Sequence, residues 1–263
     1  LDGTFPSRAQ TIHGFVQGML ASYSQEETRE FLLKQGGMAP RRVDTLLTPV
    51  EAEVRYLFNE RLKSDWSMSP KMIMFVLMIA SPLLCAVGIV REKESGAIAN
   101  IYASTISPLE YLLGKVAPYV GVSALNAIFL WLLAIILFGA PFKGNPGLFL
   151  AGSILYVICT TGIGLLVSVL VRTQVAAVLV TFVITTLPSV LYSGIFVPVE
   201  FMGQGARIVA NSLPAIHFTT IVVGSFLKGV GLDVLWENYL VLGLYAVGLF
   251  GLGWLTFTKR PGR

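Results

Sequence analysis

Charged residues are scarce in this chain. Asp, Glu, Lys and Arg make up only 13% of its 263 residues, whereas hydrophobic residues make up 54%. Soluble domains carry roughly 25% charged residues, so the composition excludes an ordinary soluble domain and indicates a membrane protein. The formal net charge of +4 comes without the clustered Lys and Arg of nucleic-acid-binding proteins, so no nucleic-acid partner is expected.

Residues that bind metals or form disulfides are also few. The sequence has two cysteines and two histidines. Cys85 and Cys159 both fall inside apolar runs, which is typical of buried cysteines that pack as small hydrophobic side chains. His13 and His217, far apart in the sequence, cannot make a metal site alone. No Gly-x-x-x-x-Gly-Lys-Ser/Thr loop is present to hold ATP phosphates. We therefore expect no enzyme activity and no cofactor in this chain, with an intramembrane enzyme as a weak alternative.

Five apolar runs are long enough to cross a hydrocarbon core of about 30 Å as helices. They are Met72–Val90, Val116–Phe138, Leu148–Val171, Val175–Leu191 and Leu235–Phe257. Away from its ends, none of these runs carries Asp, Glu, Lys, Arg or His. Proton- and sodium-coupled transporters place such groups inside the membrane to bind the ion. The pattern therefore argues against an ion gradient as the energy source and favours a machine moved by force applied outside the bilayer.

The segment 192–232 lies between the last two runs and is apolar but interrupted. Pro198, Gly203 and Pro214 break it, so that neither of its apolar pieces makes a clean span. We expect two short re-entrant or interfacial helices that form an outer gate or lid. His217 lies in this segment, and its sequence neighbourhood holds no acidic residue, which favours a structural role over a proton relay.

Residues 1–70 are polar enough to lie outside the membrane. Apolar residues at helical spacing predict an amphipathic helix from about Ser7 to Ser22. Ser24 and Glu27 form a capping box for a second helix, which Gly36-Gly37 would end. Alternation over 50–57 predicts a half-buried strand. The predicted fold class is thus an all-α polytopic membrane protein with a small, incomplete extracytoplasmic α/β region at 1–70 and a transmembrane domain at 71–260.

Basic residues between the runs indicate the orientation. One face collects Arg91, Lys93, Lys115, Arg172, Lys259, Arg260 and Arg263, and the other collects Lys143, Arg207 and Lys228. The first face is cytoplasmic by the positive-inside rule. Five spans with the C-terminus inside put residues 1–70 outside. We therefore expect one further membrane helix upstream, which makes six in the complete unit.

The segment 91–115 joins the first two runs and has specific local chemistry. Ser107, Pro108 and Glu110 form a capping box with proline at the first helical position, which predicts that a helix starts at Pro108. Ile98, Ile101 and Tyr102 lie at i, i+3 and i+4 and predict a short amphipathic helix before it. An ordinary interfacial loop would explain this pattern, and so would a contact surface for a soluble partner that acts on the membrane helices.

Two stretches of this segment, Arg91-Glu92-Lys93-Glu94-Ser95-Gly96 and Ser107 to Lys115, resemble the signature of ABC-2 type transporter permeases. The resemblance extends over roughly residues 50–258. The chain is similar to the permease part of fused ATPase–permease proteins of the ribosome-associated type and to related drug-efflux permeases. In that family the segment includes the coupling helix that meets the ATPase. Ala97 and Ala99 depart from the family, which often has threonine and glutamate there.

The resemblance implies the membrane component of an ATP-driven ABC exporter that moves a hydrophobic or amphipathic substrate out of the cytoplasm. The implied partners are an ABC ATPase that binds ATP and Mg, a second permease half, identical or different, and the lipid bilayer, with a periplasmic adaptor as an optional addition. The implied location is the plasma membrane, in bacteria the inner membrane. The expected ATPase-coupling residues are Arg91, Glu92, Glu94, Gly96, Ile98, Ile101, Tyr102, Ser107, Pro108 and Glu110.

Within this set we expect Glu92 and Glu94 to make polar contacts with the partner, and Ile98, Ile101 and Tyr102 to form its apolar anchor. A different class of protein, a polytopic membrane anchor or assembly protein with an extracytoplasmic interaction region, stays open. Docking of the segment on an ATPase would separate the two.

Overall fold

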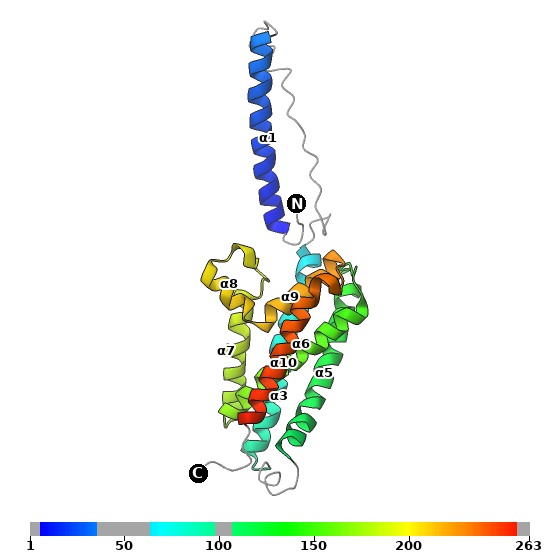
Figure 1. Ribbon diagram of the computed structural model, residues 1–263, viewed down its shortest axis with the longest axis vertical. Helices are drawn as coiled ribbons and strands as arrows, with labels where there is room; N and C mark the ends of the chain where they lie inside the picture. Colours follow the sequence, from blue (N-terminus) through cyan, green and yellow to red (C-terminus); the bar gives the residue numbers. More distant parts are fainter. Residues whose placement is uncertain (1–5, 36–63, 98–106, 257–263) are drawn as a thin grey trace. The chain divides into compact units, whose positions relative to one another are not determined.

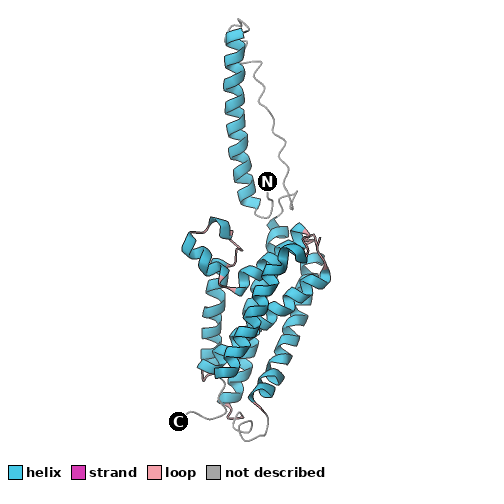
Figure 2. Ribbon diagram, in the orientation of Figure 1, coloured by secondary structure: helices cyan, strands magenta, loops and turns pink. Residues whose placement is uncertain are grey.

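The computed structural model describes residues 6–35, 64–97 and 107–256, and all regular structure in these ranges is helical (Figures 1 and 2). The chain divides into two compact units, Leu1–Ser67 and Met68–Arg263. The strand expected at 50–57 lies outside the described residues, and so does the short helix expected around Ile98 to Tyr102. The all-helical class is confirmed for the described ranges.

In the first unit, the described residues 6–35 form one long helix, α1 (Pro6–Gln35). The predicted break at Ser24 is wrong, because α1 continues through it without interruption. A side-chain hydrogen bond between neighbouring turns supports the helix at this point. The Tyr23 hydroxyl donates to Glu27 Oε1, four residues on, at 3.0 Å. The helix ends at Gln35, directly before Gly36, as the sequence predicts.

Among the described residues, five helices are long and apolar enough to cross a membrane, which confirms the five predicted spans. They are α3 (Ser64–Glu94), α5 (Pro108–Ile136), α6 (Pro146–Leu170), α7 (Gln174–Tyr192) and α10 (Leu232–Thr256). One boundary is wrong: α3 begins at Ser64, eight residues before the predicted run Met72–Val90, so the helix contains Pro70. Caps explain two other starts, since Asn145 Oδ1 accepts from Gly147 N at 2.8 Å and Thr173 Oγ1 accepts from Ala176 N at 3.2 Å.

The segment between α7 and α10 forms short helices, as predicted. They are the turn η1 (Val199–Phe201), α8 (Gln204–Asn211), α9 (Pro214–Val223) and the π-helical turn η2 (Gly224–Lys228). Helix α8 and the run 214–228 meet at 83°. If this bent pair counts as one broken span, the number of candidate spans rises to 6.

Helix α6 is the centre of the second unit and packs against α5, α7, α9 and α10. It also approaches α3 closely: a Cβ on Gly164 would lie 2.2 Å from the carbonyl oxygen of Pro82. Small residues let membrane helices come together in this way, and van der Waals packing then holds them.

Aromatic rings fill the bundle at the end where the 137–145 loop meets η2. Phe142 packs edge-on against Phe226 and Trp131, at centroid distances of 5.0 and 5.3 Å, and Tyr156 stacks on Phe218 at 4.3 Å. The loop is also held by its backbone, because the N–H groups of residues 143 and 144 donate to the Ser225 carbonyl at 3.2 and 2.8 Å. The segment 192–232 therefore contributes Phe218 and Phe226 to the packed core.

Candidate functional site

The candidate site lies at the other end of the bundle, where α3 ends and α5 begins. We call it the basic end, because Arg91, Lys93, Lys115 and Arg172 gather there. Helix α3 stops at Glu94, and Gly96 follows it with φ +74°. Glycine adopts this left-handed conformation at little cost and commonly ends helices. Gly96 thus ends α3 and directs the chain into the segment that carries Ile98, Ile101 and Tyr102.

The capping box predicted for α5 is present in full. Ser107 Oγ accepts from the backbone N–H of Glu110 at 3.2 Å, and Glu110 Oε2 accepts from the backbone N–H and the hydroxyl of Ser107, both at 2.8 Å. Pro108 is the first residue of the helix. These contacts occupy N–H groups that a helix start leaves without intrahelical partners. The start of α5 is therefore well defined.

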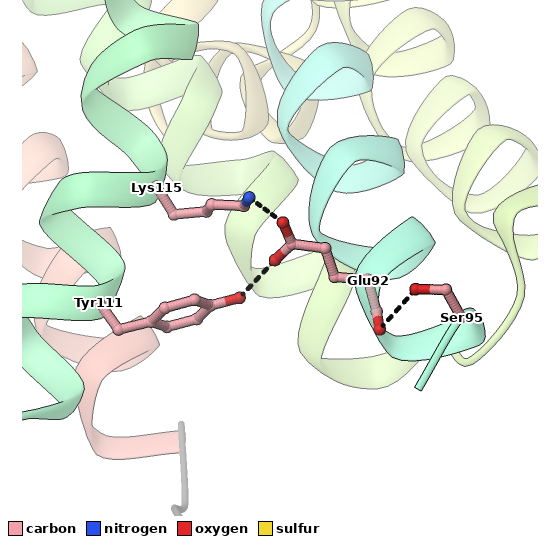
Figure 3. Close-up of polar contacts among 4 residues, drawn as sticks. All are labelled: Glu92, Ser95, Tyr111 and Lys115. Atoms are coloured by element: carbon pink, nitrogen blue, oxygen red, sulfur yellow. Dashed lines mark hydrogen bonds and ion pairs between the residues drawn. The ribbon is translucent and has the colours of Figure 1, made fainter. Parts of the chain in front are cut away.

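Glu92 joins α3 to α5 (Figure 3). Its carboxylate forms an ion pair with Lys115 through Oε1 and accepts a hydrogen bond from the Tyr111 hydroxyl through Oε2 at 3.1 Å. The side chains of Glu92 and Lys115 are each only 27% exposed. The sequence prediction missed Tyr111 and Lys115, although their spacing of four residues places them on one face of α5 and was the available signal.

The next two residues of α3 reach two further helices. The Lys93 ammonium donates to the backbone carbonyl of Ser168 in the last turn of α6. Glu94 Oε2 accepts from the side-chain amide of Gln174, the first residue of α7, at 2.5 Å. Glu92 and Glu94 therefore both bond within the chain, a use that the sequence did not suggest. Arg91 is exposed on the same turn.

Two apolar clusters underlie these polar contacts. The first brings Cys85 and Ile89 of α3 together with residues of α5 and α6 (Leu112, Val116 and Leu165). The second brings Ala86 and Val90 of α3 together with residues of α6 and α7 (Val167 and Ala177). Helix α3 is consequently packed against three helices at once. Cys85 and Cys159 are buried free thiols, as predicted.

Metal binding has no support in the described ranges. Within residues 6–35, 64–97 and 107–256, no three His, Cys, Asp or Glu side chains come together as potential ligands. His217 lies at the opposite end of the bundle, where Nε2 is 3.0 Å from the Asn211 carbonyl and Nδ1 is 3.1 Å from Asn238 Oδ1. Neither partner is acidic, which fits the structural role expected for this histidine.

A bundle of apolar helices whose basic end carries one compact polar junction is an arrangement suited to a membrane permease driven from its surface. Comparison with known families gives the same class: residues 1–255 match the family described as ABC-2 family transporter protein. The chain belongs to this family. The match includes the first 49 residues, so the resemblance extends further towards the N-terminus than the sequence signature indicated.

Several curated proteins are similar to this chain. The probable multidrug ABC transporter permease YbhS of Escherichia coli K12 is 27% identical over 259 residues, which are 98% of this chain and 66% of YbhS. The probable multidrug ABC transporter permease YbhR of the same organism is 28% identical over 90% of this chain and 61% of its own length. The inner membrane transport permease YhhJ is 25% identical over 100% of this chain and 67% of its own. No solved structure matches.

Proposed function

We propose that this chain is the transmembrane permease component of an ATP-driven ABC exporter. The observation that carries the proposal is the contact of Glu92 on α3 with Tyr111 and Lys115 on α5, at the basic end of an ABC-2 family bundle. The apolar runs carry no ionisable group away from their ends, so no ion gradient has a site to act on inside them. The movement of the helices must then be driven by a partner that acts on a surface of the protein. The segment 91–115 is a surface element attached to two spans.

The rest of the assembly follows from this role. A separate ABC ATPase would bind ATP and Mg, and a second permease half, identical or different, would complete the pathway. The complete unit would have six spans and an extracytoplasmic region at residues 1–70. The basic end would face the cytoplasm, in bacteria from the inner membrane. The similar proteins YbhS and YbhR are named as multidrug permeases, which supports a hydrophobic or amphipathic substrate.

The test measures ATP hydrolysis and dye export together, with this chain and its ATPase reconstituted in vesicles and a fluorescent amphipathic dye as the substrate. Tyr102→Ala combined with Ile98→Ala should remove the apolar anchor for the ATPase. Burial of such side chains contributes about 1.5–3 kcal/mol each, so ATPase binding should weaken by roughly tenfold or more and export should fail. Exposed ion pairs contribute only about 0–1 kcal/mol, so Arg91→Ala alone should do little.

The matched control is Phe129→Ala, which removes a 61% exposed aromatic side chain of α5 from a position outside the segment. It should leave both ATPase binding and export unchanged. If the Tyr102 and Ile98 variant binds the ATPase and exports dye like the parent, the segment is not the coupling element. If the parent chain does not bind an ATPase at all, the membrane-anchor alternative gains instead.

A further inference from the structure

Three consecutive residues at the end of α3 carry alternating charges and reach three different helices. Glu92 contacts Tyr111 and Lys115 of α5, Lys93 contacts the Ser168 carbonyl of α6, and Glu94 contacts Gln174 of α7. The side chains of successive helix residues point about 100° apart, so three residues in one turn of α3 can contact three neighbouring helices. We call Glu92, Lys93 and Glu94 the α3 junction.

The order of charges in the junction matches the ends of α6 and α7. Helix α6 ends at Leu170, so the Ser168 carbonyl is among the last four, which have no intrahelical partner. These carbonyls give a helix C-terminus a partial negative charge, which favours the ammonium of Lys93. Helix α7 begins at Gln174, and its N-terminus carries a partial positive charge that favours the carboxylate of Glu94.

The junction rests on packed side chains, so its contacts cannot separate independently. Val90 and Ala86 lie about one and two turns before Glu94, and they are buried against Val167 of α6 and Ala177 of α7. If α3 moved alone, the Lys93 ammonium and the Ser168 carbonyl would lose their partners in a partly buried place. Groups in such places are costly to leave without hydrogen bonds. Movement of α3 should therefore carry α6 and α7 with it.

We propose that Lys93 and Glu94 are positioning residues that make α3, α6 and α7 move as one body when the segment 91–115 is displaced. The inference rests on the proposed function and goes beyond it. The segment is joined by the chain to α3 and α5 only, whereas the junction extends the same displacement to α6 and α7. Neither residue needs to touch the ATPase in order to act.

The test reverses the charge order without changing composition. In the double variant Lys93→Glu, Glu94→Lys, the new carboxylate faces the partly negative C-terminus of α6 and the new ammonium faces the partly positive N-terminus of α7. The net charge of the chain is unchanged. We expect the reconstituted variant to bind the ATPase and hydrolyse ATP, while dye export per ATP falls about fivefold or more. Lys93→Met, which keeps the apolar stem and removes only the donor, gives a second variant if the reversed one does not fold.

A distance measurement separates positioning from a general loss of structure. Spin labels at Leu84 of α3 and Leu179 of α7, which are 44% and 60% exposed, report the spacing of the two helices. In the parent this distance should stay the same between the nucleotide-free and the ATP-trapped state. In the variants it should change between the two states, because α3 then moves without α7.

Two control variants should behave like the parent, and two different results would contradict the junction or the proposed function. Lys93→Arg, which keeps a cationic donor, should retain export. Thr256→Ala removes a hydroxyl that, among the described residues, bonds to the Leu252 and Gly253 carbonyls of its own helix, and should change nothing. Export and distances like the parent's in both the reversed and the Lys93→Met variants would overturn the junction, while uncoupling by Tyr102→Ala with Ile98→Ala would leave the proposed function standing. If neither set of variants uncouples export, the proposed function itself fails.

Discussion

The close approach of α3 and α6 depends on a missing side chain at Gly164. A Cβ there would lie 2.2 Å from the carbonyl oxygen of Pro82, a backbone atom that cannot move without moving α3. Gly88 is different, since a Cβ there would first meet the hydroxyl of Tyr119 at 1.9 Å, the end of a side chain that can rotate away. Two equally crowded glycines therefore differ in how well the site can adapt.

Gly164→Ala should consequently destabilise the bundle. Overpacking in a close-packed core costs about 1–3 kcal/mol, and more where backbone must shift. We expect a lower yield of monodisperse protein in detergent and a lower midpoint of thermal unfolding, measured by size exclusion and by a thiol-independent melting assay. Gly121→Ala is the matched control, because nothing lies within 4 Å of a Cβ at that exposed position of α5. It should be neutral or stabilise by about 0.5–1 kcal/mol. Equal melting midpoints for the two variants would contradict the contact between Gly164 and Pro82.

Sequence patterns predicted the residues at the start of α5 correctly, because the interaction there is local. Ser107, Pro108 and Glu110 lie within one turn, and their capping box forms as expected. Glu92 and Glu94 are different, because their partners lie 19 to 23 and 80 residues away in the chain. Only the packing of α3 against α5 and α7 brings those groups together, so spacing alone suggested an external partner for both carboxylates.

At the level of elements, the joint between α8 and α9 is held by the last span. Asn211 is the last residue of α8 and Ser212 is its C-cap, so the carbonyls of both lie at the helix end, where intrahelical partners run out. His217 of α9 lies 3.0 Å from the first, and the hydroxyl of Tyr245 donates to the second at 2.5 Å. Asn238, which contacts His217, and Tyr245 are seven residues apart and therefore lie on one face of α10. Helix α10 thus fixes the orientation of α8.

Removing these contacts should loosen α8 while leaving the spans intact. We expect Tyr245→Phe combined with His217→Ala to increase the mobility of a spin label at Ile208, a residue of α8 that is 63% exposed. Amide exchange across 204–213 should also become faster. Thr220→Ala is the control, since its hydroxyl bonds to the Ile216 carbonyl of its own helix. An unchanged label spectrum in the double variant would show that the joint is held in another way.

Element types were predictable and some boundaries were not, for a physical reason. A long apolar run that crosses a bilayer forms a helix, because a helix makes all its backbone hydrogen bonds internally. The five spans therefore follow from the composition of the runs. The start of α3 and the continuity of α1 depend on polar residues with no strong local signal. A capping box at Ser24 competes with continued helix, and in α1 the continued helix is more stable. The pattern does not distinguish these cases.

For the whole molecule, the orientation in the membrane decides whether the segment 91–115 can meet a cytoplasmic ATPase. The basic residues of one end include Arg172, in the turn between α6 and α7, and those of the other end include Lys143, in the loop between α5 and α6. Helix α6 (Pro146–Leu170) separates these two positions and is long enough to span. From the positive-inside rule we predict that Arg172 lies in the cytoplasm and Lys143 outside.

Single-cysteine labelling tests this orientation with little background. Both native thiols, Cys85 and Cys159, are fully buried, and replacing them with alanine removes the remaining reactivity. Positions 143 and 172 are both exposed. In intact cells an impermeant maleimide should label Lys143→Cys and leave Arg172→Cys unmodified, and permeabilisation should then expose Arg172→Cys to the same reagent. Labelling of position 172 before permeabilisation would turn the α3 junction away from the cytoplasm, and the proposed coupling to an ATPase would then be impossible.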